Sequence, residues 1–70
     1  MSIAKVIEVL AEGQSIEEAV QAAVTEAGKT VRGIRHVYIN EMQAIVENDK
    51  VVRYRINAKI TFVVEGGGQS

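Results

Sequence analysis

The clearest pattern in the sequence is an alternation of apolar and polar residues over residues 51–64. Successive strand residues point to opposite faces of a sheet, so this run predicts a strand with one apolar and one polar face. The apolar positions are Tyr54, Ile56, Ala58, Ile60, Phe62 and Val64. The polar positions are Arg53, Arg55, Asn57, Lys59 and Thr61. The predicted strand is about twice the usual length of roughly 5–6 residues.

A second long strand is predicted before it, and the two form a hairpin over residues 35–64. The connecting turn, residues 47–50, contains an Asn-Asp pair, and both residue types tolerate turn conformations. The apolar positions of the first hairpin strand change parity, first Val37 and Ile39, then Met42, Ala44 and Val46. A β-bulge near Asn40 and Glu41 would return both sets to one face of the sheet.

The N-terminal half predicts a short strand over residues 4–10 and then one helix. The helix starts at Ser15, whose hydroxyl can accept from the Glu18 amide while the Glu18 side chain reaches back to the Ser15 amide. Gly28 weakens the helix locally, and Gly33 is the predicted stop signal. The residues at the spacing of one helical face are Ile16, Ala19, Val20, Ala23, Val24 and Ala27. We interpret this stripe as core packing.

The predicted order is therefore β-α-β-β, an α+β fold with a three-stranded antiparallel sheet packed on one helix. The last strand is expected between the other two, with a right-handed crossover as the default if those two are parallel. One helix and one short strand are too little to cover the hairpin, so we expect other copies of the chain to do so. We expect a single domain over residues 1–64 and a flexible Gly-rich tail over residues 65–70.

Composition points the same way, because small chains usually need disulfides, metal sites or oligomerisation for stability. The 70 residues include no Cys and one His, which leaves oligomerisation. Eight Lys and Arg against nine Asp and Glu argue against a nucleic-acid partner. No signal peptide and no run long enough to span a bilayer is evident, so we expect a cytoplasmic protein without a membrane partner. The residues offer no nucleophile–base constellation, and we expect no enzyme activity.

The predicted polar face carries candidate binding residues. A basic patch could be formed by Arg55, Arg53, Lys59 and Arg35. Arginine suits phosphates and carboxylates through its planar fork. The alternative is a solvated face, or ion pairs across a subunit interface with Glu8, Glu41 or Glu47.

His36, Glu41 and Gln43 are further candidates on the first hairpin strand. His36 could stack on a flat ligand, bind a metal or face solvent. Glu41 and Gln43 lie near the predicted bulge, and bulges often re-aim side chains at sites. Glu41 could also help to bind a hard cation.

Several stretches resemble the dodecin family: KVIEV at 5–9, SIEEA at 15–19, KTVRGI at 29–34 and YRINAKITF at 54–62. The resemblance covers residues 4–64. It implies a small β-α-β-β subunit that assembles into a hollow, near-spherical homododecamer. It also implies a protein that stores or quenches flavins, bound in pairs near symmetry axes, and is not an enzyme.

Two positions depart from the flavin-binding pattern of that family. A Trp that stacks on the flavin ring is matched by His36, and a Gln that bonds the ring edge is matched by Arg55. We expect a small-molecule site that contains His36, Arg55, Arg35, Gln43 and Glu41. FMN or riboflavin is the ligand that the resemblance implies. Two alternatives stay open: a shell without flavin that has a structural, storage or cation-binding role, and a hairpin that pairs with a strand of another protein.

Overall fold

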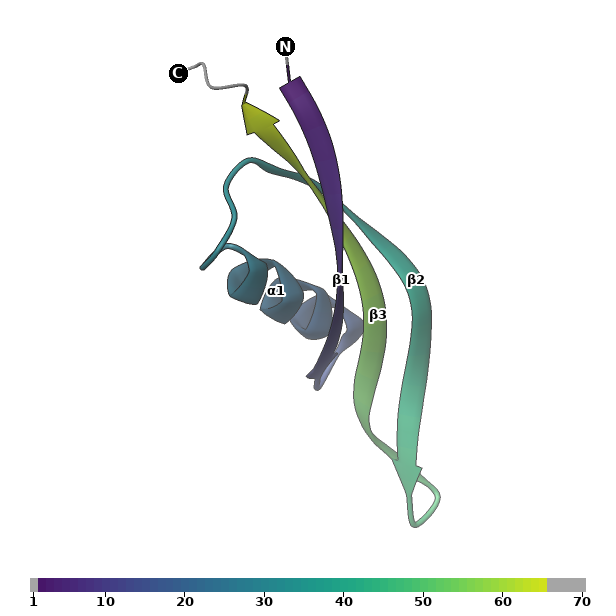
Figure 1. Cartoon of the computed structure of the whole chain (residues 1–70). Helices are drawn as coiled ribbons and strands as arrows, with labels where there is room; N and C mark the ends of the chain where they lie inside the picture. The colour runs from purple at the N-terminus through teal and green to yellow at the C-terminus, as the bar shows by residue number, and fades with distance from the viewer. Residues whose placement is uncertain (1, 66–70) are drawn as a thin grey trace.

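A computed structural model describes residues 2–65 of the chain, and the side chains of residues 3–64. The elements are β1 (Ser2–Gly13), α1 (Ile16–Ala27), β2 (Ile34–Glu47) and β3 (Lys50–Glu65). The strands form one sheet in the order β1-β3-β2, and both neighbours run antiparallel to β3 (Figure 1). The predicted α+β class, the element order and the central place of β3 are confirmed. Of the flexible tail expected over residues 65–70, Glu65 is instead the last residue of β3, and residues 66–70 lie outside the described residues.

The first strand is longer than the predicted residues 4–10, because β1 pairs with β3 along its whole length. The pairing runs from Ser2 opposite Glu65 to Gly13 opposite Tyr54. Gly13 lies close to the start of α1, and a Cβ atom there would come within 2.6 Å of the Ala19 amide nitrogen. The residues that follow the predicted strand therefore belong to β1 as far as Gly13.

The helix starts as predicted, with Ser15 as its N-cap, and the Ser15 hydroxyl accepts from the Glu18 amide at 3.0 Å. The return contact differs from the expected one, because the Glu18 carboxylate accepts from the Gln14 amide and not from Ser15. The predicted stop at Gly33 is wrong. Two backbone bonds, including one from the Gly28 amide to Val24 at 2.8 Å, close the last turn at Ala27.

Gly33 has a different role, in the loop that leads into β2. Its φ of 73° lies in the left-handed region that favours glycine. Its carbonyl accepts from the Val63 amide at 3.1 Å, and a Cβ atom would meet the Val63 carbonyl oxygen at 3.0 Å. Gly33 therefore lets the loop approach the backbone of β3 closely.

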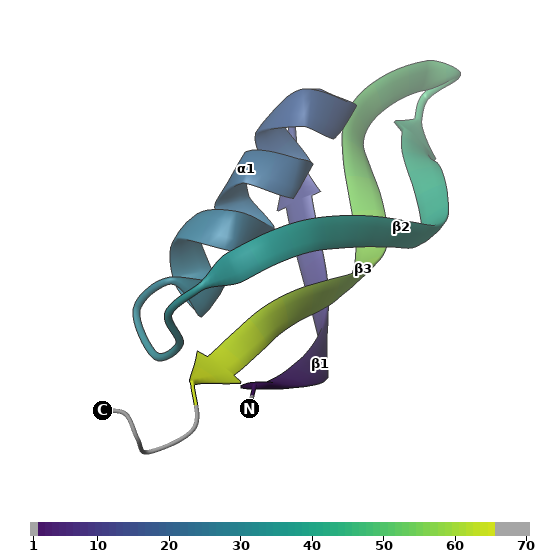
Figure 2. The same cartoon turned by 90° about the horizontal axis from the view of Figure 1, so that it is seen from above.

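The helix packs on one face of the sheet (Figure 2). The buried core consists of Ala19, Ala23, Ala27, Ile56, Ala58 and Ile60. Alanines on the helix allow it to lie close to the strands. The predicted helical stripe and the apolar face of β3 are thereby confirmed.

The hairpin turn and one bulge also follow the sequence pattern. Asn48 and Asp49 have positive φ, as a two-residue hairpin loop requires. The register shifts between Ile39 and Glu41, which confirms the bulge predicted near Asn40 and Glu41. Further register shifts, between Ile34 and His36 and between Ile45 and Val46, were not predicted.

The hairpin extends well beyond the helix (Figure 1). A helix of 12 residues spans about 18 Å, whereas a strand of 14 residues spans about 46 Å. Apolar side chains on the helix-side face of β2 are therefore uncovered, with Met42 63% and Val46 58% exposed. The radius of gyration is 14.7 Å, against about 11 Å for a compact chain of this length.

We expect Gly13→Ala to destabilise the protein by about 1–3 kcal/mol, because the added methyl group overlaps the helix start. Gly28→Ala is the matched control, since the φ of Gly28 is −64° and suits alanine. The nearest atom to an added Cβ there would be the Val24 carbonyl oxygen at 3.2 Å, against 2.6 Å for the nearest atom at Gly13. Both changes restrict the unfolded chain equally. Urea unfolding at one fixed protein concentration measures the difference. Equal midpoints for the two variants would contradict the packing argument.

Candidate functional site

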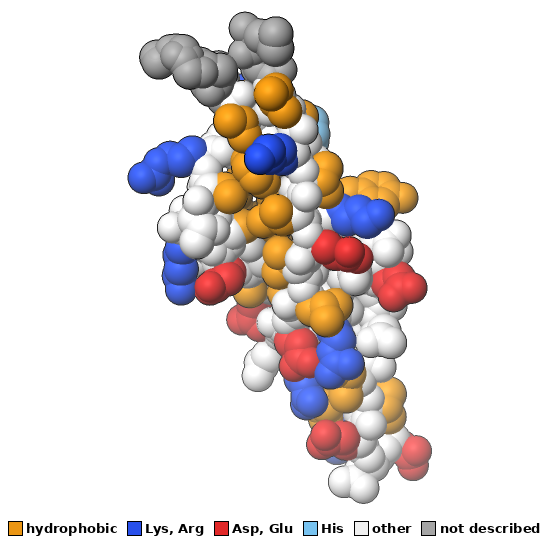
Figure 3. All heavy atoms as spheres, viewed as in Figure 1, with side chains coloured by type: hydrophobic (Ala, Val, Ile, Leu, Met, Phe, Trp, Pro, Cys, Tyr) orange, Lys and Arg blue, Asp and Glu red, His pale blue; other side chains and the backbone are white. Residues whose placement is uncertain are grey.

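We call the sheet face opposite α1 the outer face. It carries the polar residues of β3, because their neighbours Ile56, Ala58 and Ile60 are buried under the helix. On β2, His36 lies opposite Thr61 and Gln43 lies opposite Arg55. The polar residues of β3 therefore share one face as expected. That face also carries exposed apolar side chains, Val6 opposite Thr61, Leu10 opposite Asn57 and Tyr38 opposite Lys59. Figure 3 shows acidic and basic side chains interspersed along the lower part of the molecule.

Three predicted site residues meet on the outer face. Glu41, Gln43 and Arg55 line a cavity of about 30 Å³ together with Leu10, Ile56 and Asn57. The register places Gln43 directly opposite Arg55 and Glu41 opposite Asn57. The bulge at Asn40 is what gives Glu41 and Gln43 this parity. The cavity is large enough for an ordered water molecule.

Asn57, which was not among the predicted site residues, contributes an acceptor. Its Oδ1 atom is buried and has no hydrogen-bond partner among the described residues. Leaving such an acceptor unpaired costs about 1–3 kcal/mol, so the site favours a water or ligand that donates to it. The available signal was an asparagine in the middle of a long strand, where this residue type is uncommon.

Arg55 is held by Glu12, a residue beyond the end of the strand predicted over residues 4–10. The Glu12 Oε2 atom lies 2.8 Å from Arg55 Nε and 2.7 Å from Arg55 Nη2. The Oε1 atom accepts from Arg53 Nε at 3.0 Å. Of the predicted acidic partners, Glu47 lies 4.0 Å from Arg53 in the same chain. Since β1 continues to Gly13, the alternation from Glu8 to Leu10 would have placed Glu12 on the outer face.

The surroundings of Glu12 lower the pKa of its carboxyl group. The hydrogen bond from Arg55 is the largest cause, and the bond from Arg53 adds to it, whereas desolvation opposes both. The Glu12 side chain remains 40% exposed. It is therefore a charged group at neutral pH that water still reaches.

His36 lies far from this cluster within one chain. It pairs with Thr61, which is six residues along β3 from Arg55, a separation of about 20 Å. Its side chain is exposed. One chain therefore does not bring the predicted stacking residue to the predicted anchor.

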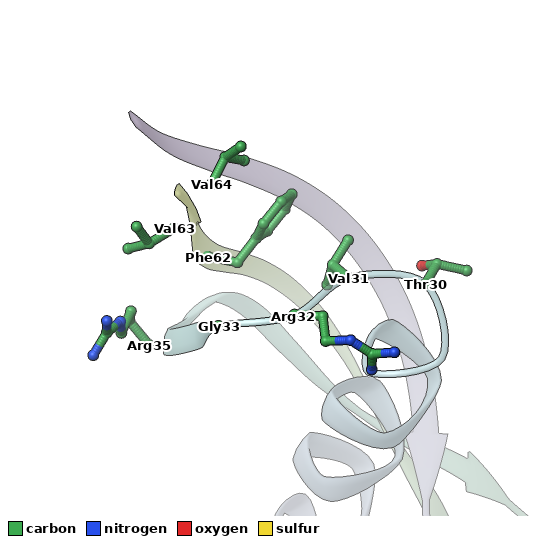
Figure 4. Close-up of a pocket in the computed structure, with 8 residues that line it drawn as sticks. All are labelled: Thr30, Val31, Arg32, Gly33, Arg35, Phe62, Val63 and Val64. Atoms are coloured by element: carbon green, nitrogen blue, oxygen red, sulfur yellow. The ribbon is translucent and has the colours of Figure 1, made fainter. Parts of the chain in front are cut away.

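Arg35 does not join the basic patch that the sequence predicted. It is the extra residue at the register shift between Ile34 and His36, and the bulge turns its side chain elsewhere. Arg35 lines an open cavity of about 440 Å³ beside Phe62 and the loop from α1 to β2. Figure 4 shows Arg35 and Arg32 on either side of Gly33, pointing away from each other.

Clusters of metal-ligating side chains and membrane-spanning helices are absent from the described residues. Within residues 2–65, no group of three or more His, Cys, Asp or Glu side chains could hold a metal ion. The single helix in that range is too short and too polar to cross a bilayer.

Comparison with known proteins places this arrangement in a family. The sequence matches the dodecin family profile over residues 3–65. The chain belongs to the dodecin family. This result confirms the resemblance noted in the sequence, and dodecins are known as storage proteins for flavins and similar small molecules. A comparison with curated proteins found no match.

Solved structures share the fold at low sequence identity. The tt0972 protein from Thermus thermophilus has a TM-score of 0.86 and 24% identity, over 94% of this chain and 98% of that one. A dodecin from Streptomyces coelicolor has a TM-score of 0.83 and 24% identity, over 93% and 94%. A dodecin from Streptomyces davaonensis has the same TM-score at 11% identity, over 93% and 97%. These structures agree in fold, and the side chains of the site must be judged in this chain.

Acid should remove the contribution of Glu12 to stability. Because its pKa is lowered in the folded protein, that contribution is complete above the unfolded pKa and is lost as the pH falls through the folded pKa. We expect the urea midpoint of wild type to fall more than that of Glu12→Gln between neutral pH and about pH 3.

The matched control is Glu8→Gln, on the same strand and the same face. Glu8 forms no ion pair with a described residue. The urea midpoint of the Glu8→Gln variant should therefore fall in acid as much as that of wild type. The argument fails if Glu12→Gln and wild type lose the same stability.

Proposed function

We propose that this protein is a cytoplasmic homo-oligomer that binds and stores a flat heterocyclic small molecule on the outer face. A flavin, riboflavin or FMN, is the ligand that family membership suggests. The observation that carries the proposal is the unpartnered Asn57 Oδ1 atom beside Arg55 and Gln43. The protein acts by binding, and we assign it no catalytic residue.

The chemistry of this cluster suits the edge of a heterocyclic ring. The Asn57 Oδ1 atom accepts a hydrogen bond, and the Gln43 amide can both donate and accept. Arg55, whose side chain is 42% exposed, adds a guanidinium group to the lining of the same cavity. A ring imide has an N–H between two carbonyl groups. Its N–H could donate to Asn57 Oδ1, and its carbonyl oxygens could accept from Gln43 and Arg55. Such a ligand would satisfy the buried Asn57 oxygen.

A second copy of the chain would complete this site. The cavity of about 30 Å³ holds only the edge of a ring, and His36 is about 20 Å from Arg55 in one chain. Exposed apolar residues at Met42 and Val46 and the elongated shape favour association of several copies. In the proposed oligomer, a dodecamer as the family suggests, His36 of a neighbouring copy stacks on the ring.

Two observations favour a second candidate, a shell that binds no flavin. The chain has no Trp, and the smaller imidazole of His36 offers less stacking area. The Glu41 carboxylate and the Asn57 Oδ1 atom are instead oxygen ligands of the kind that hard cations prefer. A structural, storage or cation-binding role would then replace flavin storage.

The mass of the purified protein tests the assembly. Light scattering is expected to give a single particle near the mass of twelve subunits. Met42→Glu places a charge on the uncovered apolar face and should yield smaller species. Ala22→Glu is the control, because Ala22 is exposed on α1 away from that face. A monomeric wild type, or Met42→Glu particles of unchanged mass, would contradict the proposed assembly.

Flavin fluorescence tests the ligand. Wild type should quench riboflavin fluorescence, and Asn57→Leu should bind about tenfold or more weakly, because the ring loses its acceptor. His36→Trp should bind more tightly, since indole stacks over a larger area. Unquenched riboflavin and FMN with wild type would rule out the flavin version. Gain of quenching only in His36→Trp would favour the shell without flavin.

A further inference from the structure

The Glu12 carboxylate lies on the outer face, beside the arginines of the proposed site. Glu12 lies opposite Arg55 in the register, and Arg53 is two residues away on the same face of β3. Both Glu12 oxygens are used, Oε1 by Arg53 at 3.0 Å and Oε2 by Arg55 at 2.7 and 2.8 Å. We propose that Glu12 is a specificity-determining residue, which excludes anionic ligands from this arginine pair and so selects uncharged rings over phosphate-bearing ones.

Direct competition is the first argument for this role. An arginine fork binds carboxylate and phosphate through the same pair of parallel N–H groups. At Arg55 the Nε atom of that pair already donates to Glu12 Oε2, and Nη2 lies 2.7 Å from the same oxygen. A phosphate group must therefore displace Glu12 or use the remaining, less well-placed N–H groups.

The local charge balance is the second argument. Arg53 and Arg55 carry two positive charges, and Glu12 and Glu47 carry two negative charges. Glu41 adds a further negative charge beside the same cavity. Displacing Glu12 with a phosphate would leave two anions side by side, which is unfavourable. The cluster therefore offers no net attraction for an anion.

An uncharged ring meets neither obstacle. Its contacts are with Asn57 and Gln43, and neither of these residues pairs with Glu12. Glu12 can then stay on its arginines and keep Arg55 in one orientation beside the cavity. The ring preference rests on the proposed function, whereas the exclusion of anions follows from the ion pairs alone.

Inorganic pyrophosphate tests the exclusion without any flavin. In titration calorimetry, Glu12→Gln should bind pyrophosphate at least about tenfold more tightly than wild type. The double variant Glu12→Gln, Arg55→Gln should lose this gain. Glu8→Gln is the matched control, with the same change of charge on the same strand, and should behave as wild type. Equal binding by the Glu12 and Glu8 variants, or a gain that survives without Arg55, overturns the inference.

The second measurement compares the affinities for riboflavin, which has no phosphate, and FMN, which has one. Wild type should bind riboflavin more tightly than FMN, and Glu12→Gln should shift this ratio toward FMN by about tenfold. A wild type that prefers FMN overturns the inference even if the variant does not fold. If no protein binds either flavin, the proposed function fails, and the pyrophosphate titration still decides the role of Glu12.

Discussion

The central position of β3 is the constraint on which the rest of the structure depends. A strand that is paired on both edges must serve two environments at once, and its alternate residues divide between them. On one face of β3, Ile56, Ala58 and Ile60 pack against the helix. On the opposite face, the alternate residues Arg55 and Asn57 belong to the candidate site. Core and site are therefore interleaved along a few residues. A substitution that shifts the register of β3 would damage both together.

Most of the fold could be predicted because it follows from local patterns. Three features could be predicted from a few neighbouring residues each: the strand β3 from its alternation, the bulge from the parity change near Asn40, and the helix start from the Ser15 cap. The end of the helix could not be read in this way. Gly28 and Gly33 are both plausible stops, and only the close approach of the loop to Val63 shows why Gly33 is needed elsewhere.

The site was less predictable, because it depends on contacts between strands far apart in the sequence. Gln43, Glu41 and Arg55 were identified by residue type, and the register brings them together. Glu12 was missed because the extent of β1 is set by pairing with β3 and not by its own composition. Arg35 was misplaced because an unpredicted bulge turns it toward another surface.

The bulge at Asn40 has a consequence for how such chains vary. Just before the bulge the odd-numbered residues of β2 face the helix side, and just after it the even-numbered residues do. The extra residue at Asn40 is what allows this change. Loss of one residue there would keep the strand but exchange the faces of its distal half, which would bring Glu41 and Gln43 inward and send Met42 outward. A single insertion or deletion could thus abolish the site while it preserves every residue type. Related chains should be compared by face, not only by sequence position.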